Sequence, residues 1–324
     1  MGSRAAGIAL ASLLVQLVVT LGCGSIISLG NSPPEGDASG DERASLDAGA
    51  DGRPLACVEL PVGRTARTTT HASITRAYRV TRAATVDTCA KIPAIFAFHG
   101  LRSSAAAEGD RRAAIEDAAE RAGAVAIFPE GSIGTTGDTG WSCTGCAAFA
   151  AADDVGFIRT IVAELGLDPA RLSAFGRDVG GSFVHRLAAE LPLTAGAVFA
   201  GTLGTTSPGG GAAVARPVAV APVTMILAHG DNDAVFPVDG GLGTRGEEVT
   251  SFDLAFAFWR AASGCTGTPI ENATVQSRTG KVACNGVTVM ATRWRDAKHI
   301  IPDSDPENPE LAVTAIIERL LAAR

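Results

Sequence analysis

Aromatic side chains are scarce in this 324-residue chain, at 5%, with one tyrosine and three tryptophans. Charged residues are also few, at 19%, and the 27 lysines and arginines do not outnumber the 34 acidic residues, so the formal net charge is -7. Proteins that bind nucleic acid need a basic surface for the phosphates, and single strands also call for stacking aromatics. The sequence has neither feature, which excludes nucleic acid as a partner.

The chain contains seven cysteines, an odd number that leaves one thiol over when the others pair. The beginning of the chain accounts for it. A mostly apolar run from Ala5 to Leu21 is short for a membrane-spanning helix and ends in Leu21-Gly22-Cys23. This segment resembles a bacterial lipoprotein signal, in which Cys23 becomes the lipidated first residue of the mature chain. The alternatives are an ordinary signal peptide cut nearby and an uncleaved anchor.

Residues 24–54 have no sustained hydrophobic periodicity and are rich in Gly, Ser, Ala, Asp and Pro. Such a composition buries too little apolar surface to fold, so we interpret the segment as a disordered acidic tether. The folded part is then predicted at 55–324, as one domain. With residues 1–23 as the signal, the protein is expected in the cell envelope, in contact with membrane only through the lipid on Cys23, or secreted.

The six remaining cysteines form an even set, which suits disulfides in an oxidising compartment, although six cysteines allow 15 pairings. Proximity in the sequence suggests Cys57–Cys89, Cys143–Cys146 and Cys265–Cys284. The two-residue spacing of Cys143 and Cys146 also occurs in redox and zinc motifs. No second such motif and no nearby histidine is present to complete a zinc site, so no metal site is predicted.

Short β-rich runs alternate with helical patterns through the folded part, which predicts a mostly parallel sheet with helices on both faces. Binding and catalytic groups on such a sheet lie at the carboxyl ends of the strands. The expected strands are Ile74–Val80, Ile92–Phe98, Ala124–Phe128, Leu172–Phe175, Gly196–Ala200, Val223–Ala228 and Val287–Trp294. The expected helices are Ala113–Ala122, Asp154–Leu165, Gly181–Glu190, Phe252–Ala262 and Glu310–Ala323.

One strand-to-helix junction has the pattern of a nucleophile elbow. The strand Leu172–Phe175 runs into Gly176-Arg-Asp-Val-Gly-Gly181, and a helix follows. The glycines relieve crowding around one exposed side chain at the centre of a sharp, strained turn. That central residue is usually serine, and here it is Asp178. Val179, which follows it, is expected to give one backbone N–H to an oxyanion hole.

Two later motifs supply the partners of an elbow residue. A strand ends in His229-Gly-Asp-Asn-Asp233, where Asp233 takes the place of a triad acid, and His299 lies between the last strand and the last helix. The order nucleophile, acid, histidine is that of the α/β-hydrolase fold. An earlier strand ends in His99-Gly-Leu101, so Leu101 is expected to give the second oxyanion-hole N–H. His99 and His229 are interpreted as packing or turn residues.

Together these motifs resemble the secreted polyhydroxybutyrate depolymerase and feruloyl or acetyl-xylan esterase family of α/β-hydrolases, over nearly the whole folded part. Further shared pieces are Asp153-Asp-Val-Gly-Phe-Ile158, Pro129-Glu-Gly131 and Phe258-Trp259. The resemblance implies a carboxylic-ester hydrolase with a triad of Asp178, Asp233 and His299 and without metal or organic cofactor. Its substrate would be a small or polymeric ester of polyester, feruloyl or acetyl type. Trp141 either lines the cleft as a substrate-binding residue or is a buried anchor.

The aspartate at the elbow leaves three functions open. The first is an esterase that works with this atypical residue, although attack on an ester by a carboxylate gives a mixed anhydride, a poorer intermediate than the ester that serine forms. The second is a catalytically silent homologue that binds polysaccharide or polyester. The third is attack by Asp178 on a saturated carbon, as in haloalkane dehalogenases and epoxide hydrolases, whose halide- or epoxide-activating residues cannot be identified in this sequence.

Overall fold

The computed structural model describes residues 57–106, 109–205 and 221–323. By compactness the chain divides into Met1–Ala50 and Asp51–Arg324, and all that follows concerns the second unit. The predicted signal, the lipidated Cys23 and the acidic tether lie outside the described residues. No helix of the described part has the length and apolar character needed to cross a bilayer.

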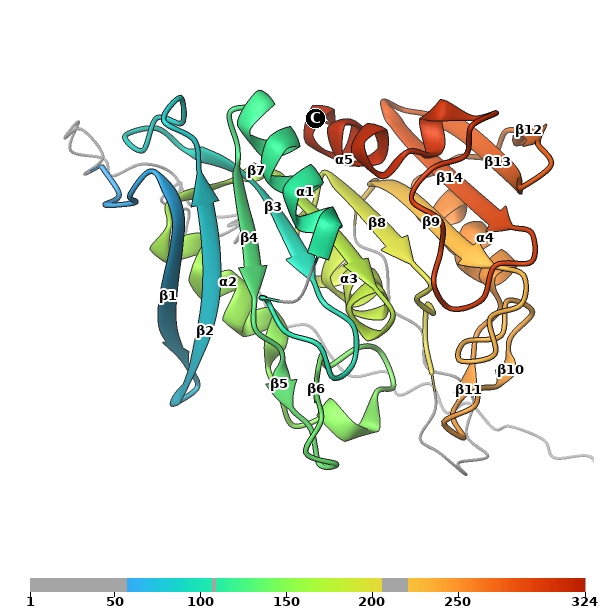
Figure 1. The fold of residues 1–324 in the computed structure, drawn as a ribbon, viewed down its shortest axis with the longest axis horizontal. Coiled ribbons are helices and arrows are strands. Elements are labelled where there is room, and N and C mark those ends of the chain that lie inside the picture. The colour runs from blue at the N-terminus through green and yellow to red at the C-terminus, as the bar shows by residue number, and fades with distance from the viewer. Residues whose placement is uncertain (1–56, 107–108, 206–220, 324) are drawn as a thin grey trace, which may run out of the picture. The chain divides into compact units, whose positions relative to one another are not determined.

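The centre of the unit is a ten-stranded sheet in the order β1-β2-β4-β3-β7-β8-β9-β14-β13-β12 (Figure 1). The six strands from β4 to β14 are parallel to their neighbours, and antiparallel strands flank them at both edges. The bounds are β1 Gly63–His71, β2 Ile74–Arg82, β3 Ile92–Phe98, β4 Val125–Pro129, β7 Leu167–Arg177, β8 Ala195–Phe199, β9 Thr224–Gly230, β12 Ile270–Ala273, β13 Ser277–Cys284 and β14 Val287–Trp294.

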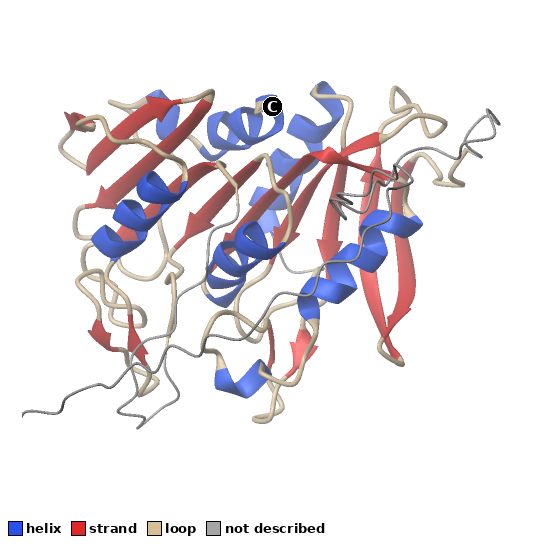
Figure 2. Ribbon diagram, turned by 180° about the vertical axis from the view of Figure 1, so that it is seen from behind, coloured by secondary structure: helices blue, strands red, loops and turns tan. Residues whose placement is uncertain are grey.

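Helices cover both faces of the sheet. Helices α1 (Gly109–Arg121) and α5 (Val313–Ala322) lie on one face (Figure 1), and α2 (Asp154–Glu164), α3 (Val179–Glu190) and α4 (Phe252–Ala262) lie on the other (Figure 2). Each face has its own hydrophobic core. Along β3, Phe96 packs into one core and Ile95 into the other, because successive side chains of a strand point to opposite faces. β3, β4 and β8, which are buried on both faces, are therefore apolar throughout.

Each expected strand and helix is found within a few residues of its predicted bounds. Helix α5 begins at Val313 rather than Glu310, because Pro309–Leu311 forms a separate 3-10 turn, η2. A second such turn, η1, spans Ala147–Phe149. The sequence did not predict β1, in which half-buried and exposed residues alternate, or β12 and β13 at the opposite edge of the sheet.

Two small hairpins extend from the loops at the carboxyl edge of the sheet. One consists of β5 (Ser132–Ile133) and β6 (Thr139–Gly140), after β4, and the other of β10 (Gly241–Leu242) and β11 (Glu248–Val249), after β9 (Figure 1). Both are too short to show a strand pattern in the sequence. They matter because the catalytic groups of a parallel sheet lie at this edge.

Three disulfides join the cysteines in the pairs that sequence proximity suggests: Cys57–Cys89, Cys143–Cys146 and Cys265–Cys284. The closely spaced pair is a disulfide, and this overturns the zinc alternative for those two residues. All three bonds are compatible with folding in an oxidising compartment.

Candidate active site

The junction between β7 and α3 is a strained turn with Asp178 at its centre. Asp178 has φ 52° and ψ -127°, and residues other than glycine rarely adopt a backbone conformation with positive φ. A Cβ atom on Gly180 would collide with the backbone of Phe98 and His99, and one on Gly176 would collide with Gly180. The glycines thus allow β7 and α3 to meet closely enough to hold Asp178 outward. This is the geometry of a nucleophile elbow.

The elbow follows β7, a central strand of a mostly parallel sheet with helices on both faces, and the elbow, Asp233 and His299 follow β7, β9 and β14 in the chain order of the α/β-hydrolase fold. The chain has the α/β-hydrolase fold.

No protein-family model matches this chain, and no curated protein sequence matches it. Among solved structures, an acetyl xylan esterase from Aspergillus awamori is 12% identical, with a TM-score of 0.49, over 74% of this chain and 95% of that one. A carboxylesterase from Bacillus cereus is 12% identical, with a TM-score of 0.47, over 76% and 93% of the two chains. The fold assignment rests on the strand order and the elbow rather than on these likenesses.

The carboxylate of Asp178 contacts three groups. Its Oδ2 accepts a hydrogen bond of 2.8 Å from the Leu101 N–H, and its Oδ1 lies 3.1 Å from His299 Nε2 and 3.4 Å from Arg245 Nη2. Only 7% of the residue is exposed. Burial opposes ionisation, but the contacts with His299, Arg245 and Leu101 outweigh it and hold the pKa of Asp178 below its usual range. The elbow residue is therefore a carboxylate anion at neutral pH.

Asp233 is the acid behind the histidine. Its Oδ1 accepts backbone N–H bonds from Val235 at 2.8 Å and Phe236 at 3.0 Å, and its Oδ2 lies 2.8 Å from His299 Nδ1. Burial acts to raise the pKa of Asp233, but the hydrogen bonds that its carboxylate accepts from His229, His299 and Phe236 hold it well below its usual range. The structure thus brings together the three residues that the sequence predicted as a triad.

His299 lies between the two carboxylates. Its Nδ1–H donates to Asp233, whereas its contact with Asp178 is an ion pair in which Nε2 makes no well-aligned hydrogen bond. Burial alone would lower the pKa of His299, but Asp178 and Asp233 together raise it to about 9. His299 therefore carries a proton at neutral pH. A serine triad begins with a neutral histidine, so the aspartate at the elbow changes the starting state of the site.

The two residues predicted to form an oxyanion hole, Leu101 and Val179, lie beside the elbow, and the N–H of Leu101 donates to Asp178 itself. The Leu101 N–H is the donor to Asp178 Oδ2, and Val179 is the first residue of α3, where N–H groups have no acceptor within the helix. His99 supports this loop from beneath, since its Nδ1 lies 2.8 Å from the Gly100 carbonyl oxygen and its Nε2 accepts from the Gly131 N–H at 2.9 Å. The packing interpretation of His99 agrees with this position.

Trp141 does not line the cleft. Its side chain is fully buried between Phe98 and Phe183, and its Nε1–H donates to the His99 carbonyl at 3.0 Å. Of the two interpretations of Trp141, the structure supports the buried anchor and overturns the substrate-binding one.

His229 lies closer to the triad than the sequence indicated. Its Nε2 lies 2.7 Å from the Phe236 carbonyl oxygen and 3.3 Å from Asp233 Oδ2. One N–H thus ties the turn that carries Asp233 to the end of β9. The sequence signal was available in the His-Gly-x-x-Asp spacing, but it does not say which way the imidazole points.

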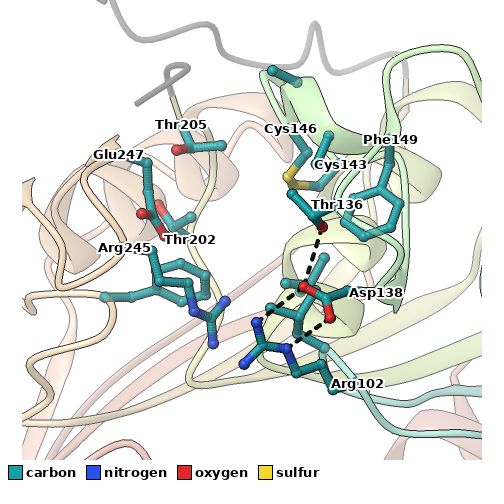
Figure 3. A pocket seen from close by; sticks show the side chains of 15 residues that line it. Arg102, Thr136, Asp138, Cys143, Cys146, Phe149, Thr202, Thr205, Arg245 and Glu247 are labelled. Carbon is teal, nitrogen blue, oxygen red and sulfur yellow. Dashed lines mark hydrogen bonds and ion pairs between the residues drawn. A yellow bond between two sulfur atoms is a disulfide. The ribbon is translucent and has the colours of Figure 1, made fainter. Parts of the chain in front are cut away.

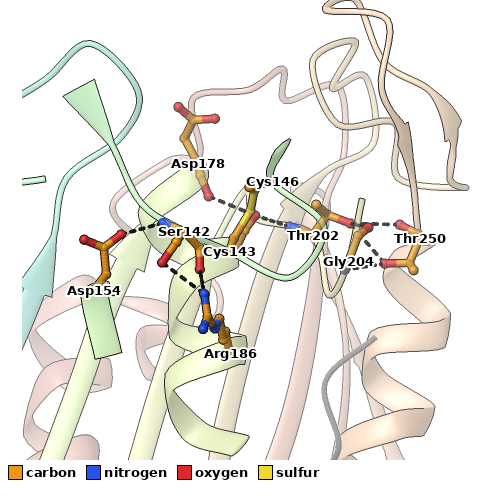
Figure 4. The surroundings of a disulfide bond; sticks show 10 residues. Ser142, Cys143, Cys146, Asp154, Asp178, Arg186, Thr202, Gly204 and Thr250 are labelled. Carbon is orange, nitrogen blue, oxygen red and sulfur yellow. Dashed lines mark hydrogen bonds between the residues drawn. A yellow bond between two sulfur atoms is a disulfide. The ribbon is translucent and has the colours of Figure 1, made fainter. Parts of the chain in front are cut away.

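A pocket of about 380 Å³ opens beside the elbow. Figure 3 shows two walls: Glu247, Thr202 and Arg245 on one, and Asp138, Arg102 and the Cys143–Cys146 disulfide on the other. Figure 4 shows the same disulfide beside Asp178 and Thr202. The lining residues are Leu101, Arg102, Thr136, Asp138, Cys143, Cys146, Ala147, Ala148, Phe149, Val179, Thr202, Thr205, Phe236, Arg245 and Glu247.

Sequence reasoning missed the charged residues of this pocket. Arg102 forms an ion pair with Asp138, with Nε 2.8 Å from Oδ1, and Arg245 reaches Asp178 from the turn between β10 and β11. These residues come from loops without a motif of their own. The described residues contain no group of three or more His, Cys, Asp or Glu side chains placed to hold a metal ion.

Proposed function

We propose that the chain is a hydrolase of carboxylic esters whose catalytic groups are Asp178, His299 and Asp233. One observation carries the proposal: on the strained elbow, the Asp178 carboxylate faces His299 at 3.1 Å, and His299 is held by Asp233 at 2.8 Å. Asp178 lies beside Leu101 and Val179, whose backbone N–H groups are the candidate donors and which line the pocket of about 380 Å³. Polyester, feruloyl and acetyl esters are the substrates to test, following the family that the sequence resembles.

In the first step, acylation of Asp178, protonated His299 acts as the acid. Asp178 Oδ1 adds to the ester carbonyl carbon, the bond from that carbon to the alcohol oxygen breaks, and His299 gives its proton to the departing oxygen. The alcohol leaves, the acyl group stays on Asp178 as a mixed anhydride, and His299 is neutral. Because a carboxylate attacks without losing a proton, the acid form of His299 is the useful one.

The second step follows from the change of charge. Once Asp178 is acylated, one of the two carboxylates that raise the pKa of His299 is gone, so the neutral imidazole is a stable base. His299 takes a proton from water, the hydroxide adds to the acyl carbon, and the bond to Asp178 breaks. The carboxylic acid leaves, and ionised Asp178 and protonated His299 are restored.

The experiment is a series of esters with alcohols of decreasing acidity, from 4-nitrophenyl acetate to ethyl acetate. A carboxylate is a better leaving group than an alkoxide, so we expect turnover to fall steeply along the series. Asp178→Asn should lower kcat/KM by about 10⁴-fold or more, the scale on which loss of a catalytic group acts. Asp168→Asn, on the same strand, is the control and should change nothing. An unchanged rate in Asp178→Asn would contradict the proposal.

A second candidate function is substitution at a saturated carbon. It is favoured by the hydrogen bond from the Leu101 N–H to Asp178 Oδ2, because Asp178 itself then occupies the donor that an incoming ester carbonyl would need. Attack by Oδ1 on the carbon would displace its leaving group as an anion and leave an alkyl ester on Asp178. Esterified Asp178 no longer raises the pKa of His299, so His299 releases its proton to solvent, and the neutral imidazole then activates the water that hydrolyses the ester.

Labelled water separates the candidates. In the alkyl pathway, water attacks the carboxyl carbon of Asp178, so repeated turnover in H₂¹⁸O places ¹⁸O in the peptide that contains Asp178. Mass spectrometry of that peptide reads the result. Acyl transfer with water attacking the substrate carbon leaves the peptide unlabelled. Ligand binding without turnover of esters, halides or epoxides would instead indicate a catalytically silent protein.

We further propose that the protein is a cell-envelope lipoprotein anchored through Cys23. The three disulfides support an oxidising compartment. Metabolic labelling with a palmitate analogue should mark the wild-type protein and leave Cys23→Ser unmarked. Absence of label from the wild-type protein would contradict the anchor.

A further inference from the structure

Glu247 is a buried carboxylate that lines the pocket without a partner. Only 8% of the residue is exposed, and its Oε2 is shielded from solvent without a hydrogen bond. Among the residues that the structure describes, no cation forms an ion pair with it. Burial of a polar oxygen without a partner is costly, so this position calls for a hydrogen-bond donor beyond those that the described residues supply.

The other charged groups around the pocket are matched with one another. Arg102 pairs with Asp138, and Arg245 lies 3.4 Å from Asp178 Oδ1. Protonated His299 is shared between Asp178 and Asp233, and none of these three residues lines the pocket. Glu247 is left over, because none of these cations pairs with it.

We propose that Glu247 binds a protonated amine carried by the substrate. An ammonium group supplies both the positive charge and up to three N–H donors, whereas a hydroxyl supplies one donor and no charge. Leu101 and Val179 line the same cavity of about 380 Å³ as Glu247, so one ligand in that cavity can contact both the elbow and Glu247. That the bound amine is part of a substrate rests on the proposed hydrolase function, whereas binding of an amine at Glu247 does not.

The test is a binding comparison that needs no turnover. Benzylamine, charged at pH 7, and benzyl alcohol, its neutral counterpart, are titrated by calorimetry into the full-length protein, Glu247→Gln and Glu248→Gln. Glu248, the neighbouring residue, is exposed and is the matched control. We expect the native protein and Glu248→Gln to prefer benzylamine by about tenfold or more, which corresponds to about 1.4 kcal/mol. Glu247→Gln should lose that preference.

Two results would overturn the proposal: equal affinity of the native protein for both compounds, or an undiminished preference in Glu247→Gln. The first is decided by the native protein alone, even if the variant does not fold. The outcome is also separate from that of the ester series. A preference for benzylamine without any ester turnover would remove the hydrolase function and keep the amine site.

Discussion

At the scale of the residue, the carboxylate at position 178 fixes the charge of His299. With Asp178 on one side and Asp233 on the other, the pKa of His299 rises to about 9. A serine at the same elbow would leave one carboxylate beside the histidine instead of two. The single side chain thus decides whether His299 begins the reaction as an acid or as a base.

This reasoning predicts opposite pH profiles for the native protein and Asp178→Ser. In the native protein, kcat/KM for 4-nitrophenyl acetate should fall as pH rises through about 9, where His299 loses its proton. In Asp178→Ser, the histidine must be neutral to activate the hydroxyl, so the rate should rise with pH, with a midpoint below 9. Stopped-flow measurements from pH 5 to 10 compare the two. Profiles of the same sign would show that His299 does not act as assigned.

A second residue-scale prediction concerns His229. Loss of its N–H to the Phe236 carbonyl frees the turn that carries Asp233, so His229→Ala should weaken the hold on His299. We expect the pKa of His299, followed by NMR titration, to fall in His229→Ala. The same variant should lose up to about 100-fold in kcat/KM, the effect of misplacing a catalytic group by about 1 Å.

The conservative variant His229→Gln shows whether His229 acts by positioning the turn that carries Asp233 or only by filling space. The amide N–H of His229→Gln can donate to the same carbonyl, so this variant should keep the native pKa of His299. If both variants titrate like the native protein, His229 is a packing residue, as the sequence alone suggested.

At the scale of the element, the approach of α3 to the ends of β3 and β7 sets the elbow. Gly180→Ala places a Cβ against the backbone of Phe98 and His99, which cannot move without displacing the Leu101 N–H. Chemical denaturation should show a loss of about 1–3 kcal/mol in the free energy of unfolding, as for overpacked cores. Gly267→Ala, where the nearest atom to the added Cβ is 3.8 Å away, should stay within about 0.5 kcal/mol. Equal effects of the two substitutions would show that the close approach is not required.

At the scale of the whole molecule, disulfides tie the described unit at both ends of the sheet. Cys57–Cys89 closes a separation of 32 residues and holds the beginning of the unit to the loop before β3. Cys143–Cys146 closes a separation of only 3. The loop-closure account of disulfide stability therefore assigns them different roles.

Replacement of Cys57 and Cys89 by serine should lower the free energy of unfolding by about 3 kcal/mol or more, because a long loop gains entropy in the unfolded chain. The matching double replacement of Cys143 and Cys146 should cost far less stability and should instead alter ligand binding, since both cysteines line the pocket. Thermal unfolding and ligand titration of the two variants check this. The reverse order of stability would contradict it.

The amino-acid sequence by itself predicted the alternating strands and helices of the central part of the sheet, the elbow and the candidate triad, and it suggested the three disulfide pairs. These features depend on short-range patterns: apolar runs of strand length, helical periodicity, glycines around Asp178, and cysteines that lie near one another in the chain. The alternating half-polar strand β1, the strands β12 and β13 and the short hairpins gave weaker patterns, and they were missed.

Only the tertiary structure decided the environment of the site. It placed Arg245 against Asp178, left Glu247 buried without a partner, brought His229 to Asp233 and buried Trp141. Each of these depends on which loops converge at the carboxyl edge of the sheet, and no local pattern specifies that. The charge of His299 follows from the same convergence, because two carboxylates far apart in the sequence meet one imidazole.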